Sequence, residues 1–183
     1  MMAGERLTRL ARGAPAKRAA AAYLRRQGGA SLSKEERAQA DELDATLEAM
    51  FLMAAVDGQV GSDEIARLTA TMEALFGTRE RGAASGTEGG ADSSTDVEGM
   101  LVHLGTSLER DGWTARLDAV ADRLVTADAR AFAFRLSAAI VFVDDHLAHA
   151  EAAALRALAA ALDLDGPTTQ HIIEDVQDAL AEG

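Results

Sequence analysis

Residues 141–164 read VFVDDHLAHAEAAALRALAAALDL, an apolar run, a short acidic turn and an Ala/Leu segment with helical spacing. The turn and the start of the next segment hold two aspartates, two histidines and one glutamate: Asp144, Asp145, His146, His149 and Glu151. The pattern predicts a buried helix, a polar turn and a second helix. Three interpretations of the turn follow: a metal site, a catalytic pair or a plain helix-to-helix connection.

The same pattern occurs earlier, in residues 53–76, which read MAAVDGQVGSDEIARLTATMEALF, and its Asp57 lies 87 residues before Asp144. When Asp57 is aligned with Asp144, Glu64 falls on Glu151 without a gap. Apolar residues then coincide at four further places, Val56 with Val143, Val60 with Leu147, Leu68 with Leu155 and Leu75 with Leu162. Two matching helical hairpins at one offset predict an internal duplication.

The composition favours one all-α domain. The chain has 183 residues, 48% of them apolar, which is enough for a single packed core. It contains 41 alanines and two prolines, and its aromatic content is 4%. Alanine is the strongest helix former, so this composition predicts closely packed helices with long uninterrupted segments.

Cysteine usage and hydropathy restrict the class of protein further. The chain has no cysteine, so disulfides and thiolate metal sites are excluded. No apolar run approaches the ~20 residues of a membrane-spanning helix. The N-terminus lacks the apolar core of a secretory signal. A cytoplasmic protein is therefore the default expectation.

The charge is distributed unevenly along the chain. Residues 1–27 carry seven basic residues and one acidic residue, a charge of +6. Because the whole chain has a net charge of −12, residues 28–183 carry −18. An acidic body disfavours nucleic acid as a partner and favours cations or a basic protein. Residues 1–30 are expected to form a basic arm, helical or mobile, that is solvated or docks on the body. A membrane or partner anchor in residues 1–27 and an organellar transit peptide stay as alternatives.

Local signals place the helices. Ser33 and Glu36 form a capping-box pattern at the start of a helix that should reach about Val56, and Ser62 is expected to cap the next helix. Residues 78–95 read as a flexible low-complexity loop. Ile65, Leu68, Met72, Leu75 and Phe76 are expected to form one buried stripe. Later helices are expected around 100–108, 113–125, 127–143 and 149–163, with a last one starting near Pro167.

The physical chemistry of the two turns explains the need for acids but leaves their role open. An aspartate at the end of a buried helix faces unfavourable carbonyl dipoles, so turn N–H groups or a cation must compensate it. A glutamate in the first turn of the next helix meets free N–H groups. Turn bonding alone would account for the aspartate, and a cation site would account for both acids.

The doubled V-D-G-x-V-x-x-D-E and V-D-D-x-L-x-x-x-E pattern, in an Ala-rich helical chain, resembles the TerB-like tellurite-resistance family. The resemblance covers roughly residues 33–181 and implies that 31–183 form a compact bundle of about seven helices. It also implies a non-enzymatic bacterial stress-response protein that binds a divalent metal and acts with protein partners. The implied metal residues are Asp57, Glu64, Asp144 and Glu151, with Asp63 and Asp145 as neighbours. Asp145 departs from the family pattern, which has glycine there.

The chemistry of these side chains indicates which cation would bind. Oxygen-only ligands suit calcium, magnesium or manganese, with a weak affinity on the order of 10⁻⁴ to 10⁻³ M. Zinc is disfavoured, because the expected helix start falls between His146 and His149 and separates the two imidazoles. No serine or cysteine stands in a pattern typical of an activated nucleophile, so an enzyme is not expected. The alternative function is a structural adaptor or cochaperone-like helical module without metal, recruited through its basic arm.

Overall fold

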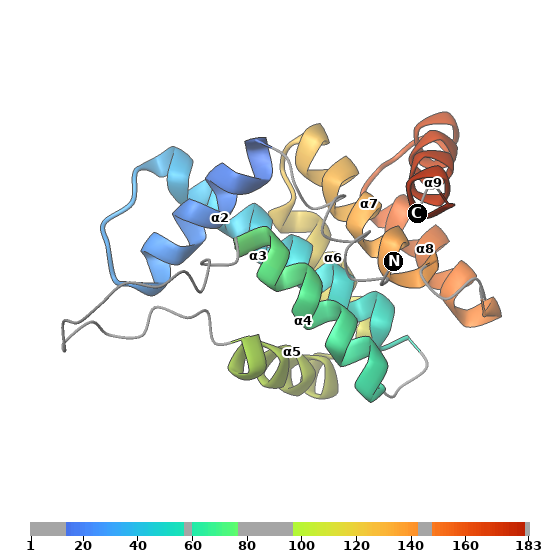
Figure 1. Cartoon of the computed structure of the whole chain (residues 1–183), viewed down its shortest axis with the longest axis horizontal. Helices are drawn as coiled ribbons and strands as arrows, with labels where there is room; N and C mark the ends of the chain where they lie inside the picture. Colours follow the sequence, from blue (N-terminus) through green and yellow to red (C-terminus); the bar gives the residue numbers. More distant parts are fainter. Residues whose placement is uncertain (1–13, 57–59, 77–96, 143–147, 182–183) are drawn as a thin grey trace.

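The computed structural model describes residues 14–56, 60–76, 97–142 and 148–181, and in these ranges the chain forms eight helices and no strand (Figure 1). The helices are α2 (Ala14–Gln27), α3 (Lys34–Ala54), α4 (Ser62–Phe76), α5 (Val97–Asp111), α6 (Trp113–Arg123), α7 (Ala127–Phe142), α8 (His149–Ala161) and α9 (Gly166–Ala181). The predicted all-α class is confirmed. The predicted loop at 78–95 lies outside the described residues.

Helix α3 is the central element of the core. It begins with the predicted capping box, in which the Glu36 N–H donates to Ser33 Oγ at 3.1 Å and the Ser33 N–H donates to Glu36 Oε2 at 2.8 Å. Its second half is buried on all sides and includes Met50 and Leu52. A segment that is buried on every face needs neighbours all round, and α2, α4, α5, α6, α7 and α8 supply them.

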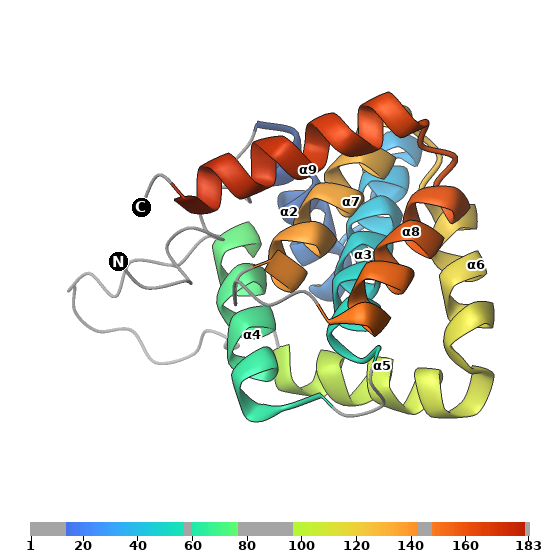
Figure 2. The ribbon, with the colours of Figure 1, turned by 90° about the vertical axis from the view of Figure 1, so that its right-hand side faces the viewer.

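Helices α3 and α7 pack extensively along each other and run in the same sense in both views (Figures 1 and 2). Phe134 and Leu136 on α7 are fully buried, and several small alanines of α7 let the two helices approach. Because both helices run in one direction, their C-terminal ends lie toward the same part of the molecule. Helices α4 and α8 begin in that part and run back along the bundle (Figure 2).

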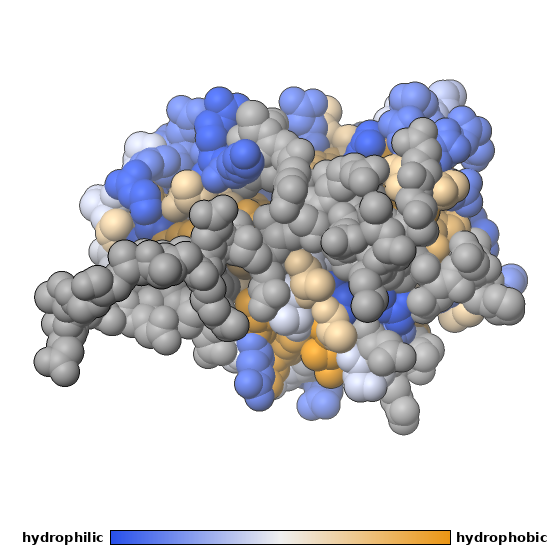
Figure 3. All heavy atoms as spheres, viewed as in Figure 1, coloured by the Kyte–Doolittle hydropathy of each residue, from blue (hydrophilic) through white to orange (hydrophobic). Residues whose placement is uncertain are grey.

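Helix α2 docks on α3 and belongs to the core. The phenol ring of Tyr23 is buried and lies 5.2 Å from the ring of Phe76 on α4. Arg26 forms an ion pair with Asp41 at 2.6 Å, and Arg25 pairs with Glu36. Residues 14–27 of the predicted basic arm therefore pack on the acidic body. The hydrophilic surface that results covers α2 and the start of α3 (Figure 3).

The buried face of α4 differs from the predicted one at Ile65. This residue, predicted in the buried stripe of α4, is 43% exposed, because the face of α4 that packs on α2 and α3 is centred on Leu68 and Met72. Gly112 alone separates α5 from α6 and has φ +82°, a conformation that favours glycine. The two helices therefore meet at a sharp corner (Figure 2).

Candidate functional site

The helices that follow the two predicted acidic turns begin with equivalent hydrogen bonds. Glu64 Oε2 accepts from the Gly61 N–H at 2.6 Å, and Glu151 Oε2 accepts from the Ala148 N–H at 2.7 Å. Both glutamates are the third residue of their helix, α4 or α8. A carboxylate there satisfies an N–H group that has no partner within the helix and lies in the favourable field of the helix dipole.

The start of α4 corrects one detail of the sequence reasoning. The Gly61 carbonyl accepts the first helical hydrogen bond, from the Ile65 N–H at 3.0 Å, and Ser62 is already the first helical residue. Ser62 therefore does not cap the helix as predicted. The reason is that the Glu64 carboxylate takes the Gly61 N–H, which lets the helix begin one residue earlier. The Ala148 carbonyl accepts from Ala152 in the same way at 3.0 Å.

The correspondence between the two hairpins is local. Helices α4 and α8 begin at equivalent positions of the alignment, and α3 and α7 precede them. Their surroundings differ, since α4 packs on α2, α3 and α7, whereas α8 packs on α3, α6 and α7. An origin of the two hairpins by duplication stays a prediction.

Of the six predicted metal residues, the structure describes the side chains of two. Glu64 and Glu151 are the two helix caps, half-buried at the starts of α4 and α8. Asp57, Asp144 and Asp145 lie outside the described residues, as does His146, and for Asp63 only the backbone in α4 is described. Among the residues that are described, no three His, Asp or Glu side chains are grouped so as to hold a metal ion.

A buried ionic cluster, defined here as Glu48 on α3 with Arg116 and Arg123 on α6, was missed by sequence reasoning. Glu48 is 3% exposed, and its Oε1 accepts from Arg116 Nε at 2.6 Å while its Oε2 pairs with Arg123. The hydrogen bond with Glu48 raises the pKa of Arg116 further above its usual value. A glutamate between Leu47 and Ala49 in an otherwise apolar stretch was the one available signal.

The cluster continues toward the surface on both sides. Arg123 Nη1 reaches Asp44 Oδ2 at 2.9 Å, and Arg116 Nη1 reaches Asp111 Oδ2 at 3.1 Å. Hydrogen bonds, first from Arg110 and then from Arg116, lower the pKa of Asp111 to about 2. Every charged group in this chain of contacts has an opposite partner, so the cluster joins α6 to α3 and offers no free acid or base.

Trp113 fastens the start of α6 to the last turn of α3. Its indole Nε1–H donates to the Leu52 carbonyl at 3.1 Å, and its ring packs partly buried against the core. Carbonyls in the last turn of a helix lack intrahelical donors, so the indole supplies one. This geometry favours an anchoring role over a partner contact.

Comparison of the chain with protein-family profiles, with curated proteins and with solved structures finds no match. Within the ranges that the structure describes, no helix combines the length and the apolar character that crossing a bilayer requires.

Proposed function

We propose that the protein is a non-enzymatic, TerB-like stress-response protein that holds a divalent cation between its two acidic turns and acts through protein partners. One observation carries the proposal. Helices α3 and α7 pack side by side in the same sense, and the helices that follow them begin with equivalent glutamates. The starts of α4 and α8 therefore lie toward the same part of the molecule (Figure 2).

The caps define what each glutamate contributes to such a site. In each helix Oε2 accepts the backbone N–H, which fixes the carboxylate and leaves Oε1 for a cation. The positive end of the helix dipole opposes a cation, so the charge has to come mainly from Asp57, Asp144 and Asp145. A weak site for calcium, magnesium or manganese fits this balance.

The second candidate function is an adaptor without metal, and the same caps favour it. Glu64 and Glu151 each have a structural role that needs no cation. Arg25 and Arg26 are paired with acids of α3, which leaves recruitment through the basic arm to residues nearer the N-terminus. In this alternative, partner binding would survive the loss of all turn acids.

An NMR titration with calcium, magnesium, manganese and zinc tests the proposal. The wild type is compared with Asp57→Asn/Asp144→Asn and with a control of equal charge change, Asp118→Asn/Asp178→Asn, at exposed aspartates of α6 and α9. We expect saturable shifts, or broadening with manganese, limited to about residues 55–64 and 142–151. They should vanish in the first variant and persist in the control. Diffuse or absent changes up to several millimolar would reject the cation site and favour the adaptor.

A further inference from the structure

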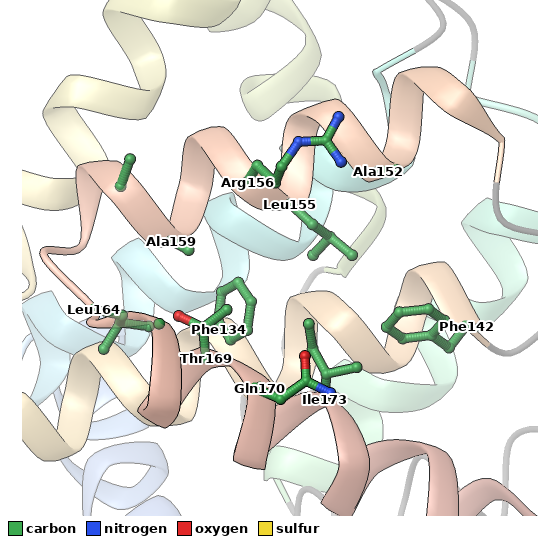
Figure 4. Close-up of a pocket in the computed structure, with 12 residues that line it drawn as sticks. Phe134, Phe142, Ala152, Leu155, Arg156, Ala159, Leu164, Thr169, Gln170 and Ile173 are labelled. Carbon is green, nitrogen blue, oxygen red and sulfur yellow. The ribbon is translucent and has the colours of Figure 1, made fainter.

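Helices α7, α8 and α9 border an open, mostly apolar groove of about 400 Å³ (Figure 4). Its walls are mostly carbon: Phe134 and Phe142 of α7, Leu155 of α8 and Ile173 of α9 point toward the same space. Alanines 152, 159 and 160 form the α8 wall beside Leu155, and their small side chains leave the volume open. A volume of this size lies within the range of small-molecule sites, roughly 300–1,000 Å³.

Among the described residues that line this groove, one has a charged side chain. Arg156 lies on the α8 side, at the rim, and is exposed. On a helix, an arginine can pair with an acid three or four residues away. The corresponding positions around Arg156 are all alanine: 152, 153, 159 and 160.

Arg156 also contrasts with its neighbours. Arg135 of α7 pairs with Asp175 of α9 at 3.1 Å, and Arg130 donates to the carbonyl of Leu124 at 2.8 Å. Within the described part of the chain, Arg156 has neither a hydrogen bond nor an ion pair. An unpaired guanidinium beside an apolar groove, in a chain of net charge −12, is therefore complementary to an anion with an apolar tail.

We propose that this groove binds a small amphipathic monocarboxylate, with its acyl chain against Phe142 and Ile173 and its carboxylate on Arg156. The guanidinium fork matches one carboxylate, whereas a dianion would need further donors. At roughly 30 Å³ for each water-sized group, the groove holds about a dozen non-hydrogen atoms, which suits a medium-chain acid. The described lining includes none of the acids predicted to bind a cation, and the proposed ligand needs no metal.

Titration with octanoate, followed by NMR, tests the proposal. Octan-1-ol, which has the same alkyl chain but no charge, serves as the control ligand. We expect saturable shifts at Phe134, Phe142, Leu155 and Ile173, with a Kd on the order of 1 mM for octanoate. Arg156→Gln should weaken octanoate binding by about threefold to tenfold and leave octanol binding unchanged. Glutamine is a good helix former, so α8 should persist.

Two further variants make the test specific. Arg18→Gln removes another exposed arginine, on α2 and away from the groove, and should leave octanoate binding unaltered. Ala152→Leu fills the groove from the α8 wall and should abolish the shifts from both ligands. Equal octanoate affinity in wild type and Arg156→Gln would overturn the proposal, as would the absence of saturable shifts at the groove. Groove shifts that depend on protein concentration alone would assign the groove to a second copy of the chain and equally overturn it.

Discussion

Glu48 on α3 accepts a hydrogen bond from Arg116 on α6 at 2.6 Å, and 68 residues separate the two in the chain. Glu48 is almost fully buried, so its charge has lost most of its hydration. Such a group is tolerated only when opposite charges and hydrogen-bond donors replace the water. The two arginines of α6 do so, and this carboxylate thus joins α6 to α3 in addition to the apolar contacts of Leu117 and Val120.

Glu48→Gln should lower the free energy of unfolding by about 3 kcal/mol, because it leaves two partly buried arginines without their carboxylate. Urea denaturation followed by circular dichroism measures this change. Asp41→Asn is the matched control: it removes an exposed partner of Arg26 and should cost less than about 1 kcal/mol. Equal losses in the two variants would show that the buried cluster contributes no more than a surface pair.

Trp113→Phe should lower the free energy of unfolding by about 1 kcal/mol, because the Leu52 carbonyl loses its indole donor while most of the ring packing is kept. Thermal unfolding followed by circular dichroism tests it, with the exposed Thr114→Ala as a neighbouring control. In the wild type, the emission of the single tryptophan should shift to longer wavelength on unfolding. A Trp113→Phe variant as stable as wild type would refute the anchoring role.

Glutamine and alanine substitutions separate the two roles of Glu64 and Glu151. The double alanine variant should lose about 0.5–2 kcal/mol of stability for each cap. The double glutamine variant should keep most of it, since a glutamine side chain can also accept the N–H of the N-cap residue. A metal titration of the glutamine variant then measures how much the two carboxylate charges contribute to cation binding. Unchanged stability in the alanine variant would contradict the capping role.

Asp111 should titrate with a pKa near 2, because hydrogen bonds from Arg110 and Arg116 favour its charged form. The folded-state pKa lies below the ordinary value of 3.8, so the stabilisation is complete above about pH 4 and is lost as the pH falls through about 2. Carboxyl-carbon NMR across this range measures the titration. In Arg110→Gln the midpoint should rise toward 3.8, and an unmoved midpoint would disprove the assigned cause.

Tyr23, the single tyrosine, should ionise above its ordinary pKa of 10.0, because burial of the phenol disfavours the phenolate and nearby Asp44 adds to the effect. Its folded-state pKa is raised, so the stabilisation is complete below about pH 10 and is lost as the pH rises through the folded-state value. Ultraviolet titration of phenolate absorbance measures it. A midpoint at or below 10.0 in the folded protein would contradict the burial of this ring.

The short-range features of the fold could be predicted from the sequence because their causes lie within a few residues. Ser33 and Glu36 form their capping box within one turn, and α3 ends within two residues of the expected boundary. Glu64 and Glu151 were assigned to the first turns of their helices, and both lie there. The identity of Gly61 rather than Ser62 as the cap was not predictable, since it depends on which donor the Glu64 carboxylate takes.

The sequence by itself determined that the protein is all-α, where most helices begin and end, and that two similar acidic turns each precede a glutamate-capped helix. These properties follow from alanine content, apolar periodicity and local hydrogen bonding. Only the tertiary structure decided that α2 docks through Tyr23, that Glu48 meets Arg116 and Arg123, and that Arg156 stands unpaired beside a groove. The physical reason is that tertiary packing determines which helix faces meet. The sequence of one helix does not specify which side chains a second helix places against it.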